Sequence, residues 1–239
     1  MNITYYDKVI RGTEHEDGLV IIQFLKGMVG QTFSFLNYYK EIPVSYDARL
    51  ISVENDMAEF EIHEYQAKVI TIEKKALIRA HEKSPVPDDL VGEVFYVNTA
   101  RRKVILTRFH YAKIRSDLRR FVRVCLDDRR ADVDIYLEND IIPASVRDIS
   151  LGGVALRVTD PAGIEPGMEV NLILKLVTPD DASPHEIGVA CTVTRLLGGA
   201  PDCTCILEFH PDRHSQLALA YYINQRQVEI IRELKELAS

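Results

Sequence analysis

Two arginines lie four positions apart in the segment DLRRFVRVCL, residues 117–126. Arg119 and Arg123 can turn to the same side whether this segment is helical or extended. A guanidinium is planar, always charged and a forked donor. It can bridge two phosphate oxygens, pair with the O6 and N7 edge of guanine, or stack on a purine face. The pair therefore suits an anionic ligand with phosphates and guanines, and the alternative is a solvated arginine turn.

A second segment, RDISLGGVALRV at residues 147–158, combines an acid, a hydroxyl and two glycines. The Asp148 carboxylate can accept two N–H bonds from the Watson–Crick edge of guanine. The Ser150 hydroxyl and the glycine amides can approach ligand oxygens closely. The alternative is an Asx turn in which a glycine takes a positive φ between two strands.

Together, Arg119-x-x-x-Arg123 and Asp148-x-Ser150-x-x-Gly153 resemble the paired signature of the PilZ domain. That family is a six-stranded β-barrel that binds the bacterial second messenger cyclic di-GMP. The resemblance covers residues 115–237. The first half, whose strands run directly into the arginine segment, resembles the N-terminal, PilZN-like barrel of two-domain proteins of the flagellar-brake kind.

The resemblance implies a receptor for cyclic di-GMP. Arg119 and Arg123 would hold phosphates and guanine edges, and Asp148 would accept from guanine N–H groups. Ser150 and Gly153 would shape the contact. The expected ligand-binding residues are Arg119, Arg120, Arg123, Asp148, Ser150, Gly152 and Gly153.

The same resemblance implies a switch, because the arginine segment lies at the expected domain junction. Ligand binding would change the interdomain arrangement or the binding of a protein partner, which points to motility, biofilm formation or secretion. Leu118 stands where an arginine could have stacked on an additional ligand, so the number of bound ligands stays open.

The elements that must position these residues are mainly β. Helical spacing of apolar residues predicts one helix over residues 17–30. Strand-length segments follow at residues 44–55, 57–65, 67–73 and 76–80, with a hairpin around residues 98–102. We therefore expect an N-terminal domain over residues 1–112, a split-barrel-like antiparallel β-barrel with one helix.

The second half predicts a barrel followed by a long helix. Strand-like segments lie at residues 121–126, 131–137, 142–150, 153–158, 169–177, 186–197 and 203–209. Asp212 is the expected cap of the helix. Tyr221, Val228, Ile231 and Leu234 of this helix can pack on the barrel or pair with another subunit, so a homodimer stays open. We expect a PilZ domain over residues 113–239, with a six-stranded antiparallel barrel.

Composition narrows the classes of function. The chain has 239 residues, a net charge of −7 and a pI near 5.5, which argues against a dedicated DNA binder. Residues 101–130 nevertheless hold eleven basic and three acidic residues, a local charge of +8 that favours an anionic ligand.

Other features predict a cytoplasmic protein. The longest apolar run, residues 19–30, is too short to span a membrane, and the N-terminus lacks the order of a secretory signal. The four cysteines form no CxxC pair and are expected to be buried free thiols in a reducing compartment.

An enzyme and a nucleic-acid binder are the alternatives to a receptor. His210 and His214 are spaced like a helical metal pair, and Cys203 and Cys205 share a strand face, but further ligands are missing. No nucleophile elbow, P-loop or dinucleotide-binding glycine motif occurs either. We therefore expect no catalysis, no metal and no cofactor.

Small β-barrels can also bind single-stranded nucleic acids on aromatic platforms beside basic grooves. Phe95, Tyr96, Phe109 and Tyr111 lie near the basic stretch, but their alternation with aliphatic residues favours core packing. A scaffold that binds proteins and no ligand is the remaining alternative.

Overall fold

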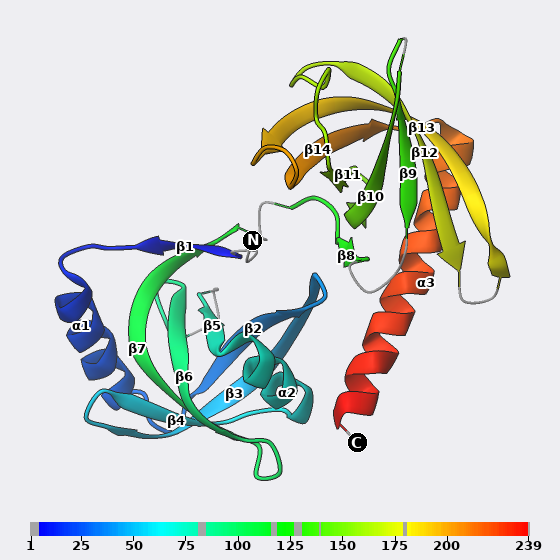
Figure 1. Ribbon diagram of the computed structural model, residues 1–239. Helices are drawn as coiled ribbons and strands as arrows, with labels where there is room; N and C mark the ends of the chain where they lie inside the picture. Colours follow the sequence, from blue (N-terminus) through cyan, green and yellow to red (C-terminus); the bar gives the residue numbers. More distant parts are fainter. Residues whose placement is uncertain are drawn as a thin grey trace. The chain divides into compact units, whose positions relative to one another are not determined.

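The computed structural model describes residues 5–80, 85–115, 119–126, 131–138, 140–178 and 181–238. These residues form a mainly β structure with three helices and two seven-stranded sheets (Figure 1). One compact unit comprises Met1–Tyr39, Pro43–Arg119 and Arg232–Ser239, and the other comprises Lys40–Ile42 and Arg120–Ile231. The two-barrel fold with a long C-terminal helix is confirmed, whereas the boundary between residues 112 and 113 stays a prediction.

The first barrel closes through six strands, and a seventh strand adds to its edge. Its strands are β1 (Tyr6–Val9), β2 (Thr32–Tyr39), β3 (Ile42–Glu54), β4 (Met57–Glu61), β5 (Lys75–Arg79), β6 (Leu90–Asn98) and β7 (Lys103–Ile114). The order β7-β4-β3-β2-β5-β6 is closed by the antiparallel pairing of β6 with β7, and β1 pairs with β7. The hairpin expected around residues 98–102 joins β6 to β7.

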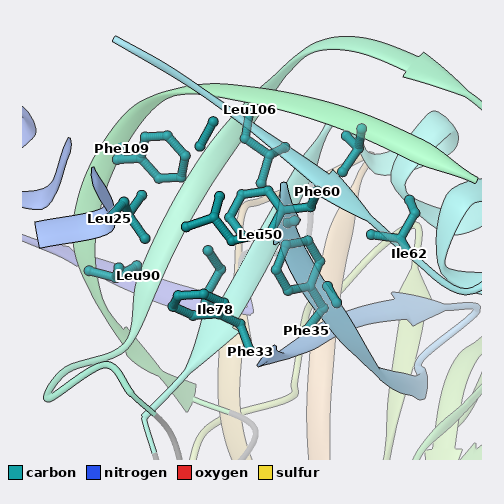
Figure 2. Close-up of a cluster of buried hydrophobic side chains, with 14 of the residues drawn as sticks. Leu25, Phe33, Phe35, Leu50, Phe60, Ile62, Ile78, Leu90, Leu106 and Phe109 are labelled. Carbon is teal, nitrogen blue, oxygen red and sulfur yellow. The ribbon is translucent and has the colours of Figure 1, made fainter. Parts of the chain in front are cut away.

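Apolar side chains fill the interior of the first barrel (Figure 2). Successive strand residues point to opposite faces, so alternate positions such as Phe33 and Phe35 of β2 both point inward. Phe33 meets Phe60 of β4 edge to face, with ring centres 5.7 Å apart. Burial of these aromatic rings contributes much of the hydrophobic stabilisation of the barrel.

The first helix, α1 (Glu14–Lys26), begins and ends earlier than the predicted range of residues 17–30. The side chain of Thr13 accepts a hydrogen bond from the Glu16 backbone, and the Glu16 side chain accepts one from the Thr13 backbone. This capping box satisfies backbone donors that would otherwise lack partners, and it fixes the start of the helix. The helix ends at Gly27.

The second helix, α2 (Glu64–Glu73), was not predicted, and the strand expected at residues 67–73 is wrong. The helix starts where the His63 side chain accepts from the Tyr65 N–H, and it ends at Lys74 in a left-handed conformation. Ala67 and Ile70, three positions apart, are fully buried. Tertiary burial of this face outweighs the strand preference of the β-branched residues in the segment.

The second barrel is closed by six strands, as predicted. Its sheet contains β8 (Val124–Cys125), β9 (Asp132–Tyr136), β10 (Ile141–Ser150), β11 (Gly153–Val158), β12 (Glu169–Thr178), β13 (Asp181–Leu197) and β14 (Cys203–His210). The ring runs β9-β10-β11-β14-β13-β12, and the short strand β8 pairs with β10 outside it.

All four cysteines lie among the described residues, and none forms a disulfide. Cys191, Cys203 and Cys205 are buried as expected, but Cys125 on the short strand β8 is partly exposed, so its predicted burial is wrong. Burial raises the pKa of the Cys191 and Cys205 thiols to about 12. Both thiols therefore stay protonated and unreactive at neutral pH.

The long helix α3 (Arg213–Ala238) begins at the predicted cap. The Ser215 N–H donates to Oδ1 of Asp212 over 2.7 Å, and the Gln216 N–H donates to the Asp212 carbonyl over 2.9 Å. Hydrogen bonds from the Ser215 side chain and backbone hold the pKa of the Asp212 carboxyl below its usual range.

Replacement of Asp212 by alanine is expected to lower the Tm at neutral pH. Because the pKa of Asp212 is lower in the folded state, its stabilising effect is present above the unfolded pKa of about 4 and is lost as the pH falls through the folded pKa. Thermal unfolding followed by circular dichroism at several pH values would measure this. Asp202→Ala, at an exposed loop position of the same unit, is the control. A Tm deficit that persists unchanged in acid would contradict the role of the carboxylate.

Candidate functional site

The pairing of β8 with β10 brings the two motif segments side by side. Cys125 lies opposite Asp148, and Val124 lies opposite Ile149. The Leu126 N–H donates to the Arg147 carbonyl over 2.8 Å. Arg123 directly precedes β8, and Ser150 is the last residue of β10. Residues from segments far apart in the sequence therefore share one edge of the second barrel.

Asp148 lies between two arginines at this edge. Nη1 of Arg123 is 3.5 Å from its Oδ1, and Nε of Arg147 is 3.6 Å from its Oδ2. Asp148 is only 4% exposed, whereas the Arg123 side chain is 36% exposed. A guanidinium has five N–H donors, so Arg123 can contact Asp148 and still offer donors to a ligand in solvent. The carboxylate orients the cation.

The turn between β10 and β11 depends on a close backbone approach. The Ser150 hydroxyl donates to the Gly153 carbonyl over 3.2 Å. A Cβ at Gly153 would lie 2.2 Å from the carbonyl oxygen of Leu207 on β14, which is far inside van der Waals contact. Gly153 is therefore required by the packing of β11 against β14. Neither Gly152 nor Gly153 has a positive φ, so the hypothesis of a glycine turn with positive φ is wrong here.

Phe121 is a residue at this site that the sequence interpretation missed. A Cβ at Gly152 would lie 2.9 Å from Cδ2 of Phe121, so the aromatic ring covers this glycine. The guanidinium carbon of Arg120 lies 5.4 Å from the centre of the same ring. Two features of the sequence could have indicated this contact: the aromatic residue that lies between the two motif arginines, and the Gly-Gly pair in the second motif segment. The Arg120 cation thus lies over the face of an aromatic ring at the site.

Arg119 belongs to the first unit, where its guanidinium carbon lies 5.8 Å from the centre of the Tyr5 ring. Leu118, Arg129 and Arg130 lie outside the described residues. The structure thus groups Arg123, Asp148 and the Ser150 turn with Phe121 and Arg120, and it shows Arg119 on an aromatic ring of its own unit.

Arg226 of α3 supports the site from inside the barrel unit, and nothing in its sequence context indicated this. Its side chain is 2% exposed, with Nε donating to the Cys125 carbonyl over 3.4 Å and Nη1 3.0 Å from Oε2 of Glu229. Since Cys125 pairs with Asp148, the contact from Arg226 helps hold β8 against β10. Arg226 is a positioning residue.

The other residues that the sequence offered as candidates lie outside this site. The ring of His210 contacts the Thr192 hydroxyl over 2.7 Å at the surface. Within the described ranges, no group of three or more histidine, cysteine or acidic residues could hold a metal ion, and no helix is long and apolar enough to cross a membrane. Phe109 is buried, but Phe95 and Tyr96 are exposed, so their expected core packing is wrong.

Comparison with known proteins gives a family for the second barrel. A comparison with curated proteins found no match. Among solved structures, the inhibitor of motility MotI/DgrA of Bacillus subtilis is 17% identical, with 84% of this chain and 98% of that chain covered and a TM-score of 0.41. YcgR of Escherichia coli, in complex with c-di-GMP, is 10% identical, with 92% and 93% covered and a TM-score of 0.44. The MrkH–c-di-GMP complex of K. pneumonia is 14% identical, with 96% and 99% covered and a TM-score of 0.42.

All three TM-scores lie below 0.5, so the assignment depends on the family match. Residues 117–225 match the model of the PilZ domain. This range contains the motif residues from Arg119 to Gly153, the closed six-stranded barrel and the first half of α3. The second barrel of this chain is a PilZ domain.

Proposed function

We propose that this protein is a cyclic di-GMP receptor and not an enzyme. The proposed contacts come from Arg119, Arg120, Arg123, Asp148, Ser150, Gly152 and Gly153. The observation that carries the proposal is the partly exposed side chain of Arg123, whose guanidinium is held 3.5 Å from the buried carboxylate of Asp148, inside a PilZ domain.

Each group has a chemical part in this proposal. Arg123 donates to a phosphate or to the O6 and N7 edge of guanine. Asp148 accepts from the guanine N–H groups, and Ser150 lies beside them. The Phe121 ring and the Arg120 cation offer a surface on which a purine can stack.

Ligand binding would then act on the arginine segment. Residues 119–123 are in neither helix nor strand, so few backbone hydrogen bonds oppose their movement. A ligand that contacts them differently in two arrangements shifts the population between those arrangements. The proposed output is a change in the interdomain arrangement or in the binding of a protein partner, in the cytoplasm where this messenger acts.

Isothermal titration with cyclic di-GMP tests the receptor function, with linear pGpG and cyclic di-AMP as controls. We expect saturable binding of cyclic di-GMP and much weaker binding of both controls. Equal binding of single-stranded RNA, with a steep dependence on salt, would instead indicate a nucleic-acid binder.

Small-angle scattering with and without saturating ligand tests the switch separately. Superimposable curves would contradict an interdomain change even where titration shows binding.

A further inference from the structure

The long helix α3 has an apolar face that the barrel does not cover. One face of the helix is buried through Leu219, Tyr222, Ile223, Arg226 and Ile230. On the opposite face Leu217 is 64% exposed, Tyr221 56%, Val228 53% and Ile231 43%. With Asn224, these four residues form what we call the α3 stripe. Large apolar residues left in water cost roughly 25 cal/mol per Å² of surface, so a continuous stripe indicates a partner.

The spacing of the α3 stripe is that of a helix–helix seam. Residues 217, 221, 224, 228 and 231 follow one another at steps of four, three, four and three. The mean step of 3.5 is the repeat that keeps one helix face against another. The stripe runs along about 21 Å of the helix, or roughly four turns.

The face that carries the α3 stripe also lacks exposed charge. From Ser215 to Ile231 the only charged residues are Arg226 and Glu229, which pair with each other and whose side chains are 2% and 14% exposed. Charged residues make up 27% of the whole chain, and Arg232, Glu233, Lys235 and Glu236 follow directly. An uncharged face does not repel an identical copy of itself.

We propose that the α3 stripe binds the α3 stripe of a second copy of this chain. Asn224 is the middle residue of the stripe, so a two-fold pairing sets Asn224 opposite Asn224 in either relative direction of the two helices. Two asparagine side chains can satisfy each other by hydrogen bonding, and a single buried asparagine at such a seam fixes register and oligomeric state. The helix is already folded against its own barrel, so this short seam carries no cost of helix nucleation.

Sedimentation of the full chain at micromolar concentrations tests this pairing. We expect the wild-type protein to be a dimer and the variant Tyr221→Glu/Val228→Glu to be a monomer at the same concentrations, because four carboxylates would be buried in the seam. Ile141→Glu is the matched control, because Ile141 is 56% exposed on the same unit and lies outside the stripe, and this variant should remain dimeric. A monomeric wild-type protein, as expected if the first unit covers the stripe instead, would overturn the proposal.

A cross-linking variant provides a measurement that does not depend on the folding of the charged variant. Asn224→Cys in a Cys125→Ser background should form an intermolecular disulfide on mild oxidation, because the other three native thiols are buried. Glu165→Cys, at an exposed loop position of the same unit, should not. Absence of the Asn224→Cys cross-link, or equal cross-linking by both variants, would also overturn the proposal.

Discussion

Replacement of Arg123 by alanine is expected to weaken cyclic di-GMP binding by about 10- to 150-fold. A hydrogen bond to a charged group contributes about 1.5–3 kcal/mol, and each 1.4 kcal/mol corresponds to a factor of about ten in affinity. Arg123 is the partly exposed member of the pair with Asp148, so its guanidinium is the group of that pair that a ligand in solvent can reach. Isothermal titration of the variant against the wild type measures the loss.

Three further variants make this result specific. Arg123→Lys keeps the charge but loses the forked donor, so it should recover only part of the affinity. Asp148→Asn replaces a carboxylate oxygen by a donor and should weaken binding, because guanine N–H groups need acceptors. Arg195→Ala, at an exposed position on β13, removes a cation away from the site and should bind like the wild type. Equal losses of affinity for Arg195→Ala and Arg123→Ala would mean that ligand binding depends only on the overall charge of the protein.

Replacement of Gly153 by alanine is expected to destabilise the second barrel by at least about 3 kcal/mol, at the upper end of what overpacking costs. The added Cβ would lie 2.2 Å from the Leu207 carbonyl oxygen, and neither can move away easily, because the Cβ is bonded directly to Cα and both residues are held in the β11–β14 ladder. The Tm of this barrel should fall by on the order of 10 °C or more. Thermal unfolding followed by circular dichroism measures the shift.

Two other glycines serve as controls for this effect. Gly188→Ala on β13 should be close to neutral, because a Cβ there would have no heavy atom within 4 Å. Gly152→Ala should have an intermediate effect, because its Cβ would meet only the Phe121 ring, a side chain that can move. A Gly153→Ala protein as stable as Gly188→Ala would contradict a packing requirement at Gly153. In that case, any loss of ligand binding by Gly153→Ala would have to come from a change at the ligand-binding site and not from destabilisation of the barrel.

Some elements of this fold follow from local sequence, and others depend on contacts between distant segments. The hairpin at residues 98–102, the cap at Asp212 and the strands of the second barrel were predicted, because turn residues, capping residues and alternation act over a few neighbouring residues. Helix α2 was missed because its β-branched residues favour a strand locally. The exposure of both Phe95 and Tyr96 was missed because the register of β6 against β7 shifts between Val94 and Tyr96, and such an irregularity interrupts the simple alternation that the prediction assumed.

The sequence by itself determined the chemistry of the candidate site, since the residue types and their spacing are present in the two motif segments. Only the tertiary structure decided that Arg123 lies against Asp148, that Phe121 covers Gly152, and that Arg226 supports β8. These contacts arise from the pairing of strands and helices distant in the chain, and local propensity carries no information on such pairings. For the same reason, helical spacing placed Tyr221, Val228 and Ile231 on one face of α3, and only packing against the barrel decided that this face is exposed.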